Sequence, residues 1–124
     1  IIDKRRPQAG VSEVMNVIGD VKDAACILVD DIVDSAGTLC NAAGALKERG
    51  ASSVAAYVSH GVLSGPAGER IANSPMTEVV TSDSIKASDA VRDCGKIRQL
   101  PIAPLMAEAI RRISEEKSVS VLFD

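Results

Sequence analysis

Runs of apolar residues separated by turn-forming residues predict a succession of strands along the chain. Four strands are predicted, at 27–30, 54–59, 78–82 and 97–100. The run at 27–29 is wholly apolar, which suits a strand buried on both faces of a sheet. The segment 11–21 alternates less regularly and predicts a short hairpin or edge strand. Residues 119–123 form an apolar tail, for which an edge strand is the plain structural interpretation.

Three helices are predicted between and after these strands. The first shows one apolar face at the i, i+3, i+4 and i+7 spacing: Leu39, Ala42, Ala43 and Leu46. It ends at Gly50, after cations in the last turn. The second opens at 64–66 and stops at 73–75, where prolines flank it. The third is marked by Met106, Ala109, Ile110 and Ile113, with i,i+4 charge pairs on its wet side: Glu108–Arg112, Arg111–Glu115 and Arg112–Glu116.

Strands that alternate with helices imply right-handed crossovers and a parallel sheet. The predicted fold class is therefore α/β, a parallel sheet flanked by helices, in one domain over residues 1–124. The composition agrees, because 46% of the residues are hydrophobic but only one Phe, one Tyr and no Trp are present. Aliphatic side chains must fill the core, as they do in sheets covered by helices.

Charge and cysteine content exclude several classes of protein. A formal net charge of -3 gives no electrostatic case for binding nucleic acid or a membrane surface. No apolar run approaches the ~20 residues of a membrane span, and no secretion signal is visible. The cysteines Cys26, Cys40 and Cys94 are odd in number and widely spaced, so a zinc site is not indicated. We interpret them as buried, reduced thiols of a cytoplasmic protein.

The most informative stretch, residues 26–39, reads CILVDDIVDSAGTL. Its strand is followed by two acids and then by a small, hydroxylic loop that leads into a helix. Loop N–H groups and the helix N-terminus favour a phosphate at that point. The paired acids repel a phosphate and suit sugar hydroxyls or Mg²⁺. The pattern therefore predicts a sugar phosphate as ligand. The alternative is an ordinary capped strand–turn–helix, which needs only one acid or hydroxyl.

This stretch resembles the PRPP-binding loop of type I phosphoribosyltransferases and ribose-phosphate diphosphokinases, also called PRPP synthetases. The whole chain is similar to the C-terminal, phosphoribosyltransferase-like domain of the diphosphokinases. The matching segments are IIDKRRP, SEVMNVIGDV, VDDIVDSAGTL, HGVLSGPA, LMAEAIRRI and SVSVLF. The resemblance implies a type I phosphoribosyltransferase-like fold. It also implies the reaction of ribose 5-phosphate with ATP, giving PRPP and AMP, in a two-domain enzyme whose N-terminal half is absent from this chain.

The resemblance also implies roles for particular residues. Asp30 and Asp31 would face the ribose hydroxyls and the cofactor Mg²⁺. The 5-phosphate would be wrapped by the loop residues Asp34, Ser35, Ala36, Gly37 and Thr38. Lys4 and Arg6 would place cations over the ATP phosphates, where diphosphoryl transfer builds negative charge. Taken alone, the sequence around them predicts a solvated basic turn, because Pro7 stops it.

Two further features stay open. Ser118, Ser120 and Phe123 match a segment that helps to form a regulatory phosphate or ADP site between subunits in the family. On an extended strand the two hydroxyls would face one side. His60 follows a predicted strand, so it is expected at the ligand-binding end of the sheet. A lone histidine is more often structural, and its role is left undecided.

Several functions remain in competition. Beside the diphosphokinase stand a type I phosphoribosyltransferase, a non-catalytic PRPP-synthetase-associated regulator and a PRPP-sensing binding module. The diphosphokinase is preferred because the basic segment and the tail both match it. The resemblance implies ATP, ribose 5-phosphate, the missing N-terminal domain and neighbouring subunits as partners, and a homo-oligomer, commonly a hexamer. The chain alone is expected to bind the sugar phosphate without turning it over.

Overall fold

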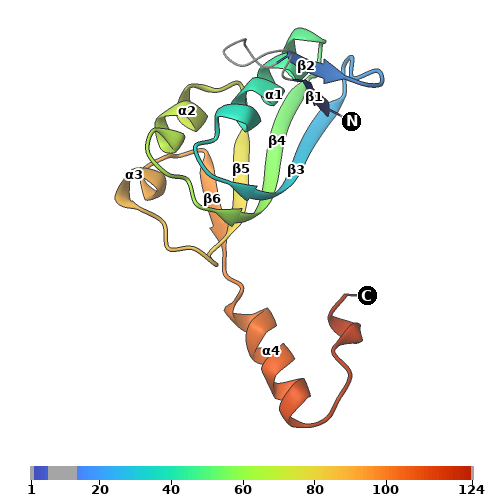
Figure 1. Cartoon of the computed structure of the whole chain (residues 1–124), viewed down its shortest axis with the longest axis vertical. Coiled ribbons are helices and arrows are strands. Elements are labelled where there is room, and N and C mark those ends of the chain that lie inside the picture. Colours follow the sequence, from blue (N-terminus) through green and yellow to red (C-terminus); the bar gives the residue numbers. More distant parts are fainter. Residues whose placement is uncertain (1, 6–13, 124) are drawn as a thin grey trace.

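The computed structural model describes residues 2–5 and 14–123 (Figure 1). Its elements, in chain order, are β1 (Ile2–Arg5), β2 (Val14–Val17), β3 (Ala25–Val33), α1 (Gly37–Glu48), β4 (Ser53–Gly61), α2 (Ala67–Asn73), β5 (Glu78–Ser82), α3 (Asp89–Arg92), β6 (Ile97–Leu100), α4 (Ala103–Ser114) and the 3₁₀ turn η1 (Ser120–Leu122). Strands β3 to β6 pair in parallel in the order β3-β4-β5-β6, and β1 pairs with β2 in an antiparallel hairpin. The predicted α/β class with a parallel sheet is confirmed.

The core lies between the sheet and the helices α1 and α2. Strand β4 buries alternate residues, Val54, Ala56 and Val58, as the period of a strand requires. Helix α1 buries the four residues that the sequence pattern selected, Leu39, Ala42, Ala43 and Leu46. In α2 the side chain of Ile71 is fully buried. The sequence-based prediction of α1 is therefore confirmed in both extent and facing.

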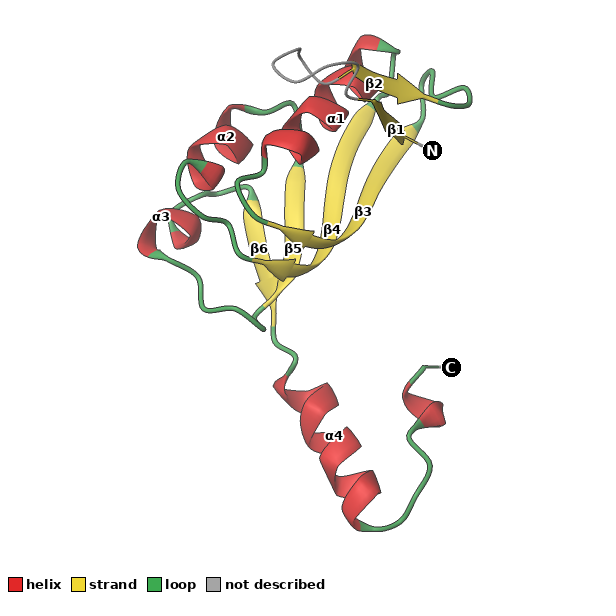
Figure 2. Cartoon of the chain, viewed as in Figure 1, coloured by secondary structure: helices red, strands yellow, loops and turns green. Residues whose placement is uncertain are grey.

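The opposite face of the sheet is open, contrary to the prediction that the first strand is buried on both faces. Figure 2 shows α1, α2 and α3 gathered on one side of the sheet. Residues of β3 on the other side stay exposed, Ile27 by 56% and Val29 by 81%. Tyr57 of β4 is 43% exposed. The apolar run at 27–29 predicted burial of both faces of the strand. The described helices of this chain cover only one face of the sheet.

Helix α4 forms as predicted, but it projects away from the sheet (Figure 1). None of its residues is buried, and Ile110 and Ile113 are exposed on its apolar side. The predicted pairs Glu108–Arg112 and Arg111–Glu115 are present as salt bridges. The tail is not a strand, because residues 120–122 form a 3₁₀ turn. The tail lies beyond α4 and away from the sheet, so it does not pair with a strand of the sheet (Figure 1).

The N-terminal predictions need two corrections. The hairpin is not contained in 11–21, since β2 pairs with β1, with Ile2 opposite Val17. Lys4 and Arg5 lie in β1 rather than in a loop, with the backbone of Lys4 paired to Met15. Arg6 lies outside the described residues. Residues 2–5 are one apolar residue followed by three charged ones, so the sequence shows no strand period there.

The cysteines are all free thiols, but only Cys94 is buried, while Cys26 and Cys40 are partly exposed. The prediction of three buried thiols is thus right for one of them. Within residues 2–5 and 14–123, no helix is long and apolar enough to cross a membrane.

Candidate functional site

The candidate site lies at the loop that connects β3 to α1. The prediction that Asp30 and Asp31 end the strand is wrong, because β3 continues through both acids to Val33. The loop then turns at Ala36, whose backbone is left-handed with φ 59° and ψ 7°. That conformation costs a residue with a Cβ atom about 1–2 kcal/mol. It must therefore be held in place by its surroundings.

Helix α1 begins without the side-chain cap that an ordinary strand–turn–helix would have. Its N-cap residue is Ala36, which makes no side-chain hydrogen bond, and the first turn contains no acidic residue. The helix therefore has no acidic side chain in its own first turn to balance its positive N-terminal end. This absence of a cap disfavours the structural interpretation of the loop and favours an anion site.

A pocket of about 380 Å³ opens at this helix end. Its lining residues come from the end of β3, the loop and the start of α1: Asp30, Ile32, Val33, Asp34, Ser35, Ala36, Gly37, Thr38 and Leu39. All five predicted phosphate-loop residues and one of the two predicted acids thus line one cavity. Asp31 is not part of this lining.

The turn after β4 holds the loop from one side. The amides of Val62 and Leu63 both donate to the carbonyl oxygen of Val33, at 2.9 and 3.2 Å. The amide of Ser64 donates to the carbonyl oxygen of Asp34 at 3.2 Å, and its hydroxyl donates to the Asp34 carboxylate. Because β3 and β4 are paired neighbours, their two exits lie side by side and fix each other.

Helix α2 holds the loop from another side, through a residue that sequence reasoning missed. The Arg70 guanidinium donates from Nη1 to the carbonyl oxygen of Ser35 at 2.9 Å. A Cβ atom built on Gly37 would lie 3.6 Å from the same nitrogen and 3.9 Å from the Ser35 hydroxyl. Nothing in the local sequence around Arg70 points to the loop, because 35 residues separate the two partners.

The two acids of β3 are placed differently. The amide of Asp31 donates to Oδ1 of Asp30 at 2.9 Å, and Asp30 lines the anion pocket. Among the described residues, no cluster of three or more His, Cys, Asp or Glu side chains could hold a metal ion. The donor set therefore does not form an all-protein metal cage. It fits Mg²⁺ in its usual manner, with one or two carboxylates and the remaining oxygens from substrate and water.

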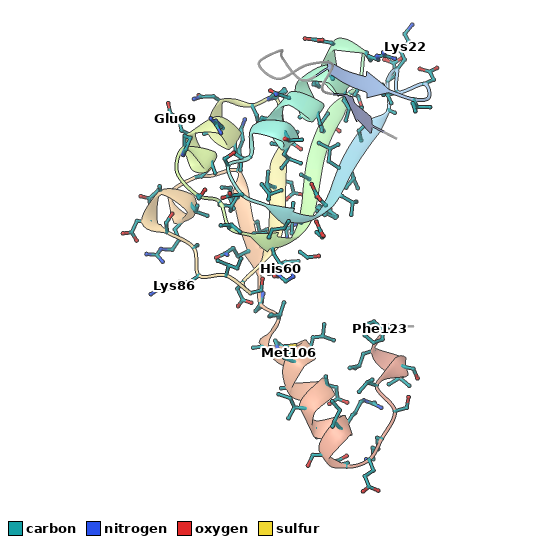
Figure 3. All side chains as sticks on the ribbon, viewed as in Figure 1. Lys22, His60, Glu69, Lys86, Met106 and Phe123 are labelled. Carbon is teal, nitrogen blue, oxygen red and sulfur yellow. The ribbon has the colours of Figure 1, made fainter. Side chains whose placement is uncertain are left out.

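His60 lies at the end of β4, near the point where the chain leaves the sheet for α4 (Figure 3). Its Nδ1 is 2.8 Å from the hydroxyl of Ser84, which is itself 2.8 Å from the hydroxyl of Ser82. The Ser82 hydroxyl donates to the carbonyl oxygen of Ser59 at 2.5 Å. These contacts link the ends of β4 and β5 and hold the His60 side chain in a hydrogen-bonded network there.

A larger pocket, of about 530 Å³, lies on the open face of the sheet. Asp30 lines it together with apolar residues that include Val29, Tyr57, Leu100 and Leu105. Asp30 is thus shared by both pockets, and it marks the boundary between the polar loop and the apolar sheet face.

The predicted regulatory residues are not brought to the loop. The hydroxyls of Ser118 and Ser120 are hydrogen-bonded to each other at 2.7 Å, although the segment is not a strand. Phe123 is 82% exposed on the C-terminal segment, which lies beyond α4 and away from the sheet (Figure 3). Their placement neither builds nor excludes an anion site.

Cys40 lies in the first turns of α1, but it is not an activated nucleophile. Burial raises the pKa of its thiol, and this effect outweighs the lowering by a hydrogen bond from Ser74 and by the charges of Arg70 and Lys96. A raised pKa keeps the thiol protonated at neutral pH, so Cys40 contributes packing to this end of the helix.

Comparisons with known proteins identify the family. Residues 4–124 match the family described as "Phosphoribosyl synthetase-associated domain". The chain is 65% identical over 124 residues to a ribose-phosphate pyrophosphokinase of Caulobacter vibrioides, covering all of this chain and 40% of that protein. It is 64% identical, with the same coverage, to the ribose-phosphate pyrophosphokinase of Granulibacter bethesdensis.

A solved structure supports the fold. The crystal structure of phosphoribosylpyrophosphate synthetase from Mycobacterium smegmatis is similar with a TM-score of 0.77 at 37% identity, over 85% of this chain and 34% of that one. The chain spans 40% of the length of the curated relatives it matches. These matches do not support its predicted placement in the C-terminal half, which stays a prediction. The chain belongs to the family described as phosphoribosyl synthetase-associated domain, and it is similar to ribose-phosphate pyrophosphokinases.

Proposed function

We propose that this chain binds the 5-phosphate of ribose 5-phosphate in the loop pocket and forms one part of a ribose-phosphate diphosphokinase active site. The observation that carries the proposal is the single cavity lined by Asp30 and the loop residues 34–38. It combines an uncapped helix N-terminus, suited to a phosphate, with a carboxylate suited to a sugar hydroxyl. The enzyme reaction is transfer of diphosphate from Mg-ATP to the 1-hydroxyl, giving PRPP and AMP.

Different residues of the pocket contact the phosphate and the ribose of the ligand. Ser35 and Thr38 offer hydroxyls and Gly37 offers backbone without a side chain, so this part takes the phosphate. Asp30 accepts hydrogen bonds from ribose hydroxyls, and with Asp31 it is the candidate to hold Mg²⁺. When bound, that ion neutralises charge on the transferred diphosphate. Asp34 is tied to Ser64, and it shapes the loop rather than meeting the phosphate.

Lys4 and Arg6 are proposed to stabilise the transferred group. In the reaction, the ribose 1-hydroxyl oxygen bonds to the β-phosphorus, the bridge to the α-phosphate breaks, and AMP leaves. Negative charge builds on the β- and γ-phosphate oxygens, where positioned cations are most effective. In the full-length protein, Lys4→Ala or Arg6→Ala should lower kcat about 10²–10³-fold with little change in KM for ribose 5-phosphate.

The rest of the active site is proposed to come from outside this chain. The absent part of the protein and neighbouring subunits of a cytoplasmic homo-oligomer would supply the adenine pocket. Ser118, Ser120 and Phe123 stay candidates for a regulatory anion site that such neighbours would complete. The chain alone should therefore bind ribose 5-phosphate and release no AMP when Mg-ATP is added.

Calorimetric titration of the chain with inorganic phosphate, ribose 5-phosphate and ribose tests the proposal. Ribose 5-phosphate should bind more tightly than phosphate, and ribose alone should bind too weakly to detect. Asp30→Asn should remove the advantage of ribose 5-phosphate over phosphate, because it removes the contact to the sugar. Equal affinity of the unaltered chain for phosphate and ribose 5-phosphate would contradict the sugar assignment.

Assays of the full-length protein separate the competing activities. AMP release from Mg-ATP and ribose 5-phosphate supports the diphosphokinase. Consumption of PRPP with a nucleobase, and no AMP release, would identify a phosphoribosyltransferase instead. Ligand binding without either reaction would identify a regulator or sensor.

A further inference from the structure

We infer that Arg70 is a positioning residue of the anion pocket, which holds the loop in shape and adds positive charge beside the bound phosphate. The inference rests on the proposed phosphate site, and it adds a residue from α2 to a site otherwise built from β3, the loop and α1. Two separate observations support it: the contact to the loop backbone and the electrostatic setting of the guanidinium.

The contact joins Arg70 to the part of the loop that needs support. Its Nη1 donates to the carbonyl oxygen of Ser35, the residue before the left-handed Ala36. A residue in that conformation persists where neighbouring contacts determine the backbone on both sides. The turn after β4 fixes Val33 and Asp34, and Arg70 fixes Ser35, so the loop is anchored up to the residue before the turn.

Arg70 is itself held by a rigid support. Helix α2 is anchored through Ala67 and Ile71, which are both fully buried. Ile71 is the residue next to Arg70, and the Arg70 amide donates to the carbonyl oxygen of Pro66 at 2.9 Å. The guanidinium is therefore supplied from a fixed backbone rather than from a loop, which is how a positioning group keeps its geometry.

The electrostatic setting points to an anion. The guanidinium lies beside Gly37, at the N-terminal end of α1, where the helix dipole is positive. Two positive groups side by side are unfavourable unless a negative group lies with them. No acidic residue lies in the first turn of α1, and within residues 17–123 no ion pair neutralises Arg70. A bound phosphate would satisfy both positive groups at once.

The remaining donors of Arg70 can serve such a ligand. A guanidinium has five N–H groups in a fixed fork, and only the Ser35 contact is present in the described part of the chain. A fork of this kind matches the oxygens of a phosphate. Its charge already reaches this end of α1, since it lowers the pKa of the Cys40 thiol against the larger effect of burial.

The test compares Arg70→Met with Arg49→Met in the 124-residue chain. Arg49 is a matched control, because its Nη1 also donates to a backbone carbonyl oxygen, that of Val17, at 3.0 Å, near the opposite end of α1. Each variant removes one positive charge. Calorimetry with inorganic phosphate and with ribose 5-phosphate measures the two affinities. Arg70→Met should weaken both ligands by the same factor, about tenfold or more, and Arg49→Met should leave both within about twofold.

Two further readouts separate this role from general stability. Arg70→Lys should recover most of the phosphate affinity, because it keeps the charge. In the ligand-free chain, Arg70→Met should shift the NMR amide signals of Gly37 and Thr38. It should lower the melting temperature no more than Arg49→Met does, since each variant loses one hydrogen bond to a backbone carbonyl oxygen.

The outcomes are distinguishable. Phosphate affinity of Arg70→Met within about twofold of the unaltered chain, or a loss equal to that of Arg49→Met, overturns the role of Arg70 alone. If the unaltered chain binds neither phosphate nor ribose 5-phosphate, both the proposed function and this inference fail. If it binds both with equal affinity, the sugar assignment fails, while the phosphate titrations still decide the role of Arg70.

Discussion

The Ser64 hydroxyl donates a hydrogen bond to the carboxylate of Asp34, although 30 residues separate them in the sequence. The amide of Ser64 also donates to the carbonyl oxygen of Asp34, at 3.2 Å. One residue of the turn after β4 thus engages both the backbone and the side chain of an acid in the anion loop. The Asp34 carboxylate therefore helps to hold the loop to the turn after β4.

Replacing Ser64 should loosen the loop. We expect Ser64→Ala to lower the free energy of unfolding by about 1 kcal/mol, because one hydrogen bond is lost. Phosphate affinity should fall as well, since Asp34 is released and can turn toward the anion. Chemical denaturation and calorimetry measure the two effects.

Ser88→Ala is the control for Ser64→Ala. Ser88 caps α3 by accepting a hydrogen bond from the Val91 amide, and no residue of α3 lines the anion pocket. Its loss should cost a similar ~1 kcal/mol of stability and leave phosphate affinity unchanged. If both variants bind phosphate as the unaltered chain does, the Ser64–Asp34 contact has no part in the site.

Gly37→Ala should separate binding from folding. A Cβ atom at this position meets Arg70 and Ser35 at ordinary contact distances, so the chain should fold with nearly unchanged stability. The same methyl group would occupy the space in which the pocket receives a phosphate oxygen. We expect about a tenfold loss of phosphate affinity, corresponding to the loss of one hydrogen bond to a charged group.

Gly44→Ala is the matched substitution in the interior of the same helix. Among the described residues, no atom outside the adjoining backbone of α1 lies within 4 Å of a Cβ placed there. It should raise stability by about 0.5–1 kcal/mol without changing phosphate affinity, because alanine favours a helix over glycine. Undiminished phosphate binding by Gly37→Ala would show that the anion does not approach this backbone.

Helix α4 should be sensitive to acid. Hydrogen bonds from Arg111 and then Arg112 hold the pKa of Glu108 below its ordinary value of 4.5. Because the pKa of Glu108 is lower in the folded chain than in the unfolded one, the pairing stabilises the helix at pH values above the ordinary pKa. That contribution disappears as the pH falls through the lowered pKa. The α4 amide signals in NMR should therefore lose helical character at acid pH before the sheet unfolds.

Glu108→Gln should remove this loss of helix at acid pH. Glu48→Gln on α1 is the control and should leave it in place, because no salt bridge of Glu48 is present among the described residues. Added salt should weaken α4 in the same way, since its charge pairs are exposed. Loss of α4 only together with the sheet would mean that the helix packs onto the rest of the chain.

The open sheet face should make the chain associate with itself. Ile27 and Val29 lie on β3, an edge of the four-stranded sheet, and they stay exposed. Exposed apolar surface on an edge strand favours association. Sedimentation should show oligomers that grow with concentration, and Val29→Lys should reduce them. Glu69→Lys on α2 is the control for added positive charge. A monomer at all concentrations would show that another segment covers this face.

The sequence by itself determined the helices, strands and loop whose pattern lies within one short segment of the chain. The period of Leu39, Ala42, Ala43 and Leu46 predicted which face of α1 is buried, because a helix repeats every 3.6 residues wherever it packs. The strands at 78–82 and 97–100 were predicted with the bounds that the structure has. The motif of small and hydroxylic residues after two acids predicted the anion loop, since such loops are built from neighbours in sequence.

Only the tertiary structure decided what approaches this loop and what covers the sheet. Arg70 and Ser64 reach it from segments that are distant in sequence, and no local pattern marks an arginine as the neighbour of a carbonyl oxygen. Asp30 and Asp31 are adjacent in sequence, yet only Asp30 lines the loop pocket. The apolar run at 27–29 predicts a strand with apolar side chains to bury. Whether helices cover one face of that strand or both depends on where the rest of the chain packs.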